Sequence, residues 1–236
     1  MNALMELGGV TFDAEGAGWV TLQKPEPALA ARSAAELLAL AAELPGNFHY
    51  VPAPYVGVAL LCEVRTLDGS AGGAEAQERL CRQLEAPAAR DGNLPAEDVV
   101  EAALEASGLA WSRRDTCWAV PATERLPREL QVTRVPGGVR VEAVLVEWDE
   151  IQEQEARALA QCLFAAQAGL RFARCELDAQ RARIASLAES ASLETDLTHS
   201  LLGVAAGCRL LAREARALLV PEVAAGFLSF CRVPDK

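Results

Sequence analysis

The pattern of apolar and polar positions in the first 90 residues predicts strands around one clear helix. Residues 55–66 alternate between two sets of side chains, and one set is entirely apolar, which is typical of a strand with one buried face. Residues 33–44 have the period of a short helix, and Ser33 and Glu36 have the spacing of a capping box. A hairpin over residues 9–23 and a helix over residues 74–85 complete the predicted order β-β-α-β-β-α.

From residue 95 onward the pattern predicts a longer series of elements. A helical face ends at Gly108, and the period then changes to two, with a turn expected at Arg114-Asp115. The run Pro-Gly-Gly at 136–138 predicts a second hairpin turn. Asp149 is expected to cap the next helix. The predicted order of this region is α-β-β-β-α-β-β-α-α.

Residues 86–98 are rich in Pro, Gly and polar side chains, which is typical of a linker, so we place a domain boundary near Asp91. The prediction is an α+β protein with two related modules, residues 1–90 and residues 91–236. Each module is expected to be an antiparallel sheet, formed by a meander plus a hairpin, packed with helices. Because both modules run through a meander, a helix, two strands and a helix, the pattern favours a tandem duplication that forms an internal pseudo-dimer.

Composition narrows the classes of function. The chain has 236 residues, is 51% hydrophobic and carries a formal net charge of -11, with no basic cluster, which argues against nucleic-acid binding. No stretch reaches the roughly 18 apolar residues of a membrane span, and no signal peptide is evident. Seven cysteines without a CxxC motif are typical of reduced thiols. We therefore expect a soluble, cytoplasmic protein that binds neither membranes nor nucleic acids.

The order α-β-β-β-α-β-β-α, with the hairpin "LRFARCELDAQRARIASLAE" before a long terminal helix, resembles the type III secretion chaperone-like superfamily. This superfamily includes the secretion chaperones and the YbjN-like proteins, and the resemblance covers residues 95–219 best and residues 1–88 more weakly. It implies a small acidic α+β module, typically dimeric, that binds another protein through apolar patches and has no catalytic residues. Two fused copies favour an internal pseudo-dimer in a monomer, and a homodimer stays open as the alternative.

Five residues are candidates for binding a partner. Two tryptophans lie in the stretch "GLAWSRRDTCWAVP", where we expect them on adjacent strands, packed across the strand pair. The strand over residues 139–148 is apolar on both faces towards its end, so the second face needs a cover, either from the rest of the chain or from a partner. The candidates are Val144, Val146, Trp148, Trp111 and Trp118.

Little in the sequence indicates catalysis. His49 and His199 have no ligand or triad spacing around them, and Cys117 is isolated, so we expect no catalytic residues, no cofactor and no metal. The acidic run "EWDEIQEQE" is explained by helix capping and the helix dipole. The leading hypothesis is a non-enzymatic adaptor or secretion-chaperone-like module that holds a segment of a partner protein. The alternatives are a small-molecule-binding or thiol-dependent enzyme with a site between the halves, and a structural subunit of an assembly.

Overall fold

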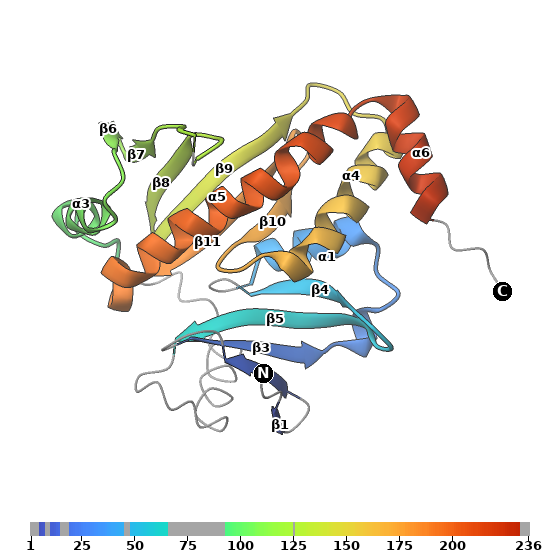
Figure 1. The fold of residues 1–236 in the computed structure, drawn as a ribbon, viewed down its shortest axis with the longest axis horizontal. Helices are drawn as coiled ribbons and strands as arrows, with labels where there is room; N and C mark the ends of the chain where they lie inside the picture. Colours follow the sequence, from blue (N-terminus) through green and yellow to red (C-terminus); the bar gives the residue numbers. More distant parts are fainter. Residues whose placement is uncertain are drawn as a thin grey trace.

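The computed structural model describes residues 5–7, 10–14, 19–44, 48–65, 93–124 and 126–231. Two antiparallel sheets pack with helices, as Figure 1 shows, and the predicted α+β class is confirmed. The predicted helix over residues 74–85 and the predicted boundary near Asp91 lie outside the described residues.

The first sheet has the strand order β1-β2-β3-β5-β4. The predicted first hairpin is confirmed as β2 and β3, whereas the short strand before it was not predicted. Both faces of β5 are covered, since Val58 and Leu60 are buried as well as Ala59 and Leu61. The strands are β1 (Met5–Leu7), β2 (Val10–Ala14), β3 (Trp19–Pro25), β4 (His49–Ala53) and β5 (Gly57–Arg65).

Helix α1 (Ala34–Ala42) follows β3 and a single 3-10 turn, η1 (Pro27–Leu29). Its predicted capping box is confirmed, because the backbone N–H of Glu36 donates to Ser33 Oγ and the backbone N–H of Ser33 donates to Glu36 Oε2, at 3.3 and 2.8 Å. The bond from the Ser33 backbone is the main reason that the pKa of Glu36 falls to about 2. The start of α1 is therefore fixed locally by the sequence.

The second sheet has the strand order β10-β11-β9-β8-β7-β6. Its predicted turns are confirmed: Asp115 and Gly137 both have positive φ, at +45° and +83°, the left-handed backbone that tight turns require. The strands are β6 (Ser112–Arg114), β7 (Cys117–Val120), β8 (Leu130–Val135), β9 (Gly138–Glu147), β10 (Arg174–Leu177) and β11 (Arg181–Glu189).

Four helices accompany the second sheet, and two of their starts differ from the prediction. The residue that caps α4 is Gln152, so Asp149 lies outside the helix and does not cap it. The sequence predicts Pro95 at the first helical position of the next helix, but α3 starts two residues later, at Glu97. The helices are α3 (Glu97–Ala106), α4 (Glu153–Ala166), α5 (Leu193–Ala217) and α6 (Pro221–Cys231), with 3-10 turns η2 (Gln167–Gly169) and η3 (Ser190–Ser192).

Helix α5 covers one face of the second sheet along β9 and β11 (Figure 1). Gly203 permits a close approach of α5 to the segment just before β10, because a Cβ atom there would lie 2.5 Å from the carbonyl oxygen of Arg171. Gly207 lies against Ile184 in the same way. The sequence pattern predicts an apolar stripe along one side of this helix, and its five positions within α5 and the C-cap residue Leu218 are all buried: Leu197, Leu201, Ala205, Cys208, Leu211 and Leu218.

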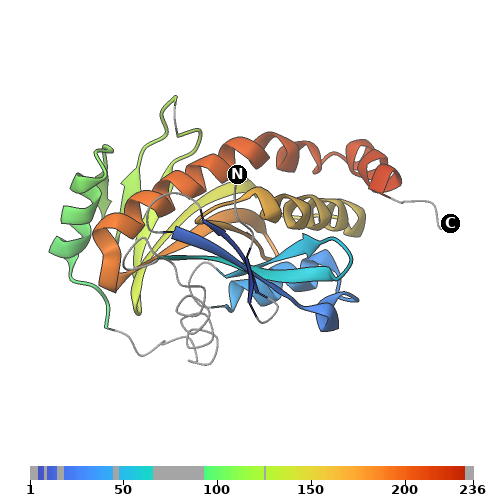
Figure 2. The same ribbon diagram turned by 60° about the horizontal axis from the view of Figure 1, so that its bottom comes forward.

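The two sheets have the same connectivity. In each one a meander leads to a helix and then to a hairpin, the second hairpin strand pairs with the last meander strand, and the first hairpin strand is at the edge. The equivalent helices α1 and α4 pack against each other, α1 also contacts β10, and α4 also contacts β4 (Figures 1 and 2). Leu38 of α1 belongs to the main hydrophobic core around the second sheet. The two halves are thus packed together.

Candidate functional site

The structure separates the candidate residues into buried and accessible ones. Trp118 is 1% exposed and Val146 is 7% exposed, so neither side chain can be a contact surface in this structure. Val144, Trp148 and Trp111 are half-buried. At the end of β9, where the sequence predicts an apolar surface, only Trp148 and part of Val144 reach the surface.

The two tryptophans of the first meander strands do not face each other. Trp111 precedes β6, and the residue opposite Trp118 is Arg113, whose guanidinium carbon lies 6.0 Å from the centroid of the indole ring. The indole N–H of Trp118 donates to Glu101 of α3 at 3.1 Å. The expected cross-strand pair of tryptophans is therefore wrong, and Trp118 anchors α3 to the sheet.

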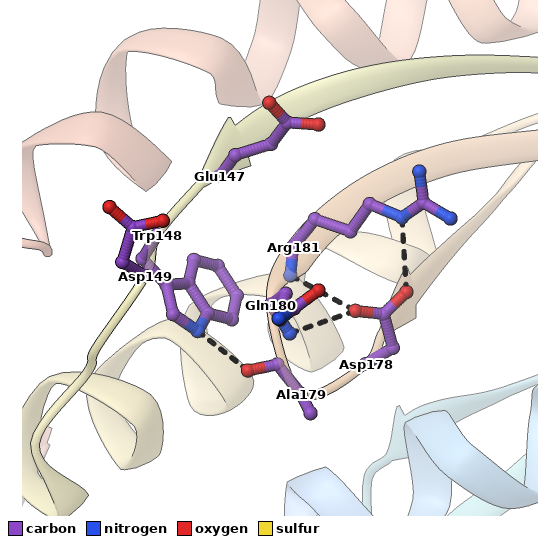
Figure 3. A pocket seen from close by; sticks show the side chains of 7 residues that line it. All are labelled: Glu147, Trp148, Asp149, Asp178, Ala179, Gln180 and Arg181. Carbon is purple, nitrogen blue, oxygen red and sulfur yellow. Dashed lines mark hydrogen bonds and ion pairs between the residues drawn. The ribbon is translucent and has the colours of Figure 1, made fainter.

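Trp148 instead lines a cleft of about 830 Å³ beside the end of β9. The opposite wall is the turn between β10 and β11, as Figure 3 shows. Glu147 and Asp149 flank the indole along the chain, and both are exposed. The lining residues are Glu147, Trp148, Asp149, Asp178, Ala179, Gln180 and Arg181.

The turn between β10 and β11 fixes the orientation of the indole. The Trp148 indole N–H donates to the carbonyl oxygen of Ala179 at 2.9 Å, and the Trp148 backbone N–H donates to the carbonyl oxygen of Gln180 at 2.9 Å. Asp178 shapes the turn, because its Oδ1 accepts from the backbone N–H groups of Gln180 and Arg181 at 2.9 and 3.0 Å. The turn therefore fixes the ring through its N–H and fixes the backbone next to it before any ligand arrives.

The cleft has an excess of negative charge. Three carboxylates line it, those of Glu147, Asp149 and Asp178, against the single lining guanidinium of Arg181. Asp178 is paired with Arg181 at 3.2 Å and with Arg183 at 3.4 Å, so the excess charge comes from Glu147 and Asp149. Burial alone would raise the pKa of Asp178, but the bonds from the Gln180 backbone and from Arg181 outweigh it and lower that pKa. An aromatic side chain among carboxylates is a chemically suitable site for a cationic side chain.

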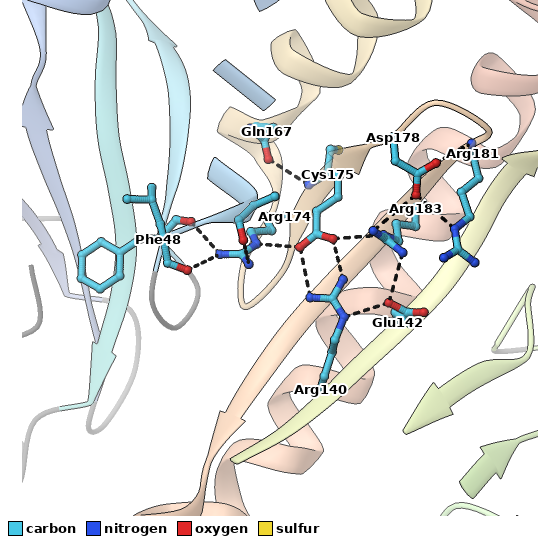
Figure 4. Close-up of polar contacts among 12 residues, drawn as sticks. Phe48, Arg140, Glu142, Gln167, Arg174, Cys175, Asp178, Arg181 and Arg183 are labelled. Carbon is cyan, nitrogen blue, oxygen red and sulfur yellow. Dashed lines mark hydrogen bonds and ion pairs between the residues drawn. The ribbon is translucent and has the colours of Figure 1, made fainter. Parts of the chain in front are cut away.

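A second polar cluster joins the two halves of the chain (Figure 4). The carboxylate of Glu176 on β10 is 3% exposed and accepts from Arg174 and Arg183, both at 3.0 Å, and from Arg140. Burial alone would raise the pKa of Glu176, but the guanidinium groups of Arg140 and Arg174 outweigh it and lower the pKa. Burial is the main reason that the pKa of Arg174 is lowered; Glu176 acts to raise it, and the nearby charges of Arg140 and Arg183 lower it further.

Arg174 also binds the end of α1. Its guanidinium donates to the carbonyl oxygens of Leu44 and Phe48, at 3.1 and 3.2 Å. Gln167, fully buried at the end of α4, donates from Nε2 to the carbonyl oxygen of Tyr50 on β4 at 2.8 Å. These bonds satisfy backbone groups of the first half with side chains of the second, so the cluster has a structural role.

Residues considered for catalysis lie on different elements. His49 is on β4, Cys117 is on β7, and His199 is on α5, where its ring centroid is 5.0 Å from that of Phe172. Among the described residues, no group of three or more His, Cys, Asp or Glu side chains has an arrangement that could hold a metal ion. No helix in the described part of the chain is long and apolar enough to cross a membrane.

Three cysteine thiols have raised pKa values. Burial raises the pKa of Cys208 to about 11 and raises that of Cys162, and it raises the pKa of Cys175 well above the ordinary value. A thiol is nucleophilic as the thiolate, so the raised pKa values make these three groups poorer nucleophiles. They serve as small apolar residues of the core.

Sequence reasoning missed the acidic wall of the cleft. Glu147 and Asp149 were attributed to the start of a helix, but α4 begins after Gln152, and its own first turn holds Glu153 and Glu155. The two carboxylates therefore have no capping role. The sequence does contain a feature that could have indicated this wall: both carboxylates flank a tryptophan at the end of an apolar strand.

Comparison of the chain with protein-family models, with curated proteins and with solved structures finds no match. The cleft and the cluster around Glu176 are therefore interpreted from their chemistry.

Proposed function

We propose that this protein is a non-enzymatic protein-binding module of the secretion-chaperone-like type, and that it holds a basic segment of a partner protein in the Trp148 cleft. The observation that carries the proposal is the cleft itself, in which a fixed indole lies among three carboxylates. Its volume of about 830 Å³ is large enough for a short peptide segment.

The chemistry of the cleft favours arginine or lysine in the bound segment. A guanidinium or ammonium over the indole face gains about 0.5–2 kcal/mol from the cation–π interaction. Glu147 and Asp149 are exposed and have no ion pair among the described residues, so they are available to a ligand. The net charge of -11 attracts a basic segment at longer range.

The shared connectivity of the two sheets supports a tandem duplication in which the halves form an internal pseudo-dimer. The contacts between them are reciprocal: α1 lies on α4 and β10, and α4 lies on α1 and β4. Arg174 and Gln167 add bonds from the second half to the first. In this proposal the pseudo-dimer supplies a rigid frame for the cleft, and the protein works in the cytoplasm.

Affinity capture from the native cytoplasm, followed by mass spectrometry, tests this function. The tagged protein is compared with a Glu147→Arg/Asp149→Arg variant, which reverses the charge of two exposed residues without touching the core. The matched control is Glu105→Arg/Glu124→Arg, with the same charge change on exposed residues outside the cleft.

We expect captured proteins that are lost in the cleft variant and retained in the control. Peptide arrays of those proteins should show binding to segments rich in Arg and Lys. Equal capture by all three proteins, or binding concentrated in acidic segments, would contradict the proposal. Thermal unfolding of each variant by circular dichroism confirms that the fold is intact.

A further inference from the structure

The outer face of α5 carries apolar side chains in a row. Leu202 is 56% exposed and Leu210 is 51% exposed, and Ala206 between them is exposed as well. These three residues are four apart, so they form one of the ridges along which helices pack against each other. In Figure 1, α5 runs across the front of the second sheet, and its C-terminal half leads towards α4 and α6. The row is therefore open to another molecule.

Basic side chains are concentrated in the C-terminal half of α5. No Lys or Arg lies between Arg183 and Arg209, and three arginines then occur within eight residues, at 209, 213 and 216. All three are exposed. Within the described part of the chain, Arg213 and Arg216 take part in no ion pair. Their guanidinium groups are therefore available to a ligand.

The arginines lie on the same side of α5 as the apolar row. An α-helix has 3.6 residues per turn, so successive side chains are about 100° apart around the axis. Seen down this axis, the two leucines lie about 40° to either side of Ala206. Arg213, Arg209 and Arg216 lie about 20°, 60° and 80° from Ala206, all in the same direction. The six residues thus share a sector of about 120°.

The acidic residues of α5 lie outside this sector. Glu214 is exposed and lies about 80° from Ala206, in the direction opposite to the arginines. Burial is the main reason that the pKa of Cys162 in α4 is raised, and Glu214 adds to it, so this carboxylate lies on the side towards α4. Glu194 and Asp196 are in the first turn of α5, about 20 Å or more along the axis from the first arginine. The sector therefore has an excess of positive charge.

We propose that this sector of α5 binds an acidic amphipathic helix of a partner protein. The apolar side chains of that helix pack on Leu202, Ala206 and Leu210, and its carboxylates pair with the arginines beside them. A guanidinium can hold a carboxylate with two parallel hydrogen bonds, which favours an acidic ligand. The net charge of -11 repels an acidic helix at long range, but at physiological salt this repulsion is largely screened beyond about 8 Å.

This surface differs from the Trp148 cleft in position and in charge. None of the residues that line the cleft belongs to α5. The cleft is acidic and suits a basic segment, whereas the arginines of α5 suit an acidic one. The inference is therefore independent of the proposed function.

Fluorescence anisotropy of a dye-labelled peptide, titrated with the full chain, tests the proposal. The probe is a helical peptide of about 16 residues, enough to span the roughly 21 Å from Leu202 to Arg216, with leucine at every fourth position and glutamate beside it. We expect saturable binding that weakens about tenfold or more in the Arg213→Glu/Arg216→Glu variant, because each attraction becomes a repulsion. The matched control, Arg32→Glu/Arg114→Glu, makes the same change of charge on exposed residues outside α5 and should bind like the wild type.

Two altered peptides separate the apolar contribution from the charged one. One has lysine in place of glutamate, and the other has serine in place of leucine. Each should bind about tenfold more weakly or worse than the acidic amphipathic peptide. The proposal is overturned if the acidic amphipathic peptide does not bind saturably, if the variant leaves its binding unchanged, or if either altered peptide binds equally well. Circular dichroism of each protein variant confirms that its fold is intact.

Two other occupants of this face are distinguished with the same variant. Co-sedimentation with vesicles of phosphatidylcholine and phosphatidylserine tests an anionic membrane, and sedimentation velocity tests a second copy of the chain. Neither readout should depend on Arg213 and Arg216. Vesicle binding or self-association that is lost in the Arg213→Glu/Arg216→Glu variant, without binding of the acidic peptide, overturns the proposal.

Discussion

Substituting Glu176 by glutamine is predicted to destabilise the protein severely. The substitution keeps the shape of the side chain but removes the one negative charge shared by Arg140, Arg174 and Arg183. Arg174 is 6% exposed and cannot turn to water, so its guanidinium would stay buried after losing the carboxylate of Glu176. The loss therefore includes the cost of a buried charge that has lost its neighbouring carboxylate, as well as the lost bonds.

The magnitude follows from the number of bonds and their burial. Hydrogen bonds to charged groups contribute about 1.5–3 kcal/mol each, and breaking a buried ion pair by removing one partner costs about 3–5 kcal/mol. Glutamine can still accept through its carbonyl oxygen, so the bonds are not all lost. We expect the free energy of unfolding to fall by about 3–5 kcal/mol, out of a typical total of about 5–15 kcal/mol.

Urea denaturation followed by far-ultraviolet circular dichroism measures this loss. The matched control is Glu129→Gln, which removes the charge from an exposed ion pair with Arg114 at 2.7 Å and should cost about 0–1 kcal/mol. The midpoint for Glu176→Gln should fall with little change in the m-value. A loss below about 1 kcal/mol, or one equal to that of the control, would refute the reasoning.

Three further predictions follow from the same structure. Folding lowers the pKa of Glu176, so this carboxylate stabilises the fold above the unfolded pKa of about 4.3, and the stabilisation is lost as the pH falls through the folded pKa. The urea midpoint of the wild type should therefore approach that of the Glu176→Gln variant as the pH is lowered from 7 to 3. Gly203→Ala should lower the free energy of unfolding by about 1–3 kcal/mol, because the new Cβ would lie 2.5 Å from Arg171 O; a variant with unchanged stability in urea would contradict the close approach. Trp148→Phe removes the bond to Ala179 O and should cost about 0.5–1.5 kcal/mol in the same assay, whereas an unchanged midpoint would show that this bond is not made in solution.

Local patterns predicted most of the elements correctly. The capping box at Ser33, the turn at Gly137 and the buried stripe of α5 each depend on side chains within a few residues of one another. Such signals are read directly from spacing. The start of α4 was misplaced because Asp149 is a good capping residue by type, and only the path of the chain shows that it lies outside the helix.

The two polar sites depend on contacts that the sequence does not specify. Glu176 meets arginines from β9, β10 and β11, and this arrangement requires the register of three strands. Trp148 acquires its partner at Ala179 through the turn between two other strands, 31 residues away. Trp118 was correctly expected to be a strand residue, but the burial of its ring depends on where α3 packs. In each case the contact depends on how distant parts of the chain pack together, which local sequence patterns do not specify.

Titration of the isotope-labelled protein with a peptide of alternating arginine and serine tests the central claim most directly. Nuclear magnetic resonance resolves the indole N–H signals of the four tryptophans, and the Trp148→Phe variant assigns the one in the cleft. We predict a saturable shift of the Trp148 signal, no shift of the buried Trp118 signal, and no response to a matched peptide with glutamate in place of arginine. A Trp148 signal that stays unchanged with the basic peptide, or that moves equally with the acidic one, would contradict the binding of basic segments at this cleft.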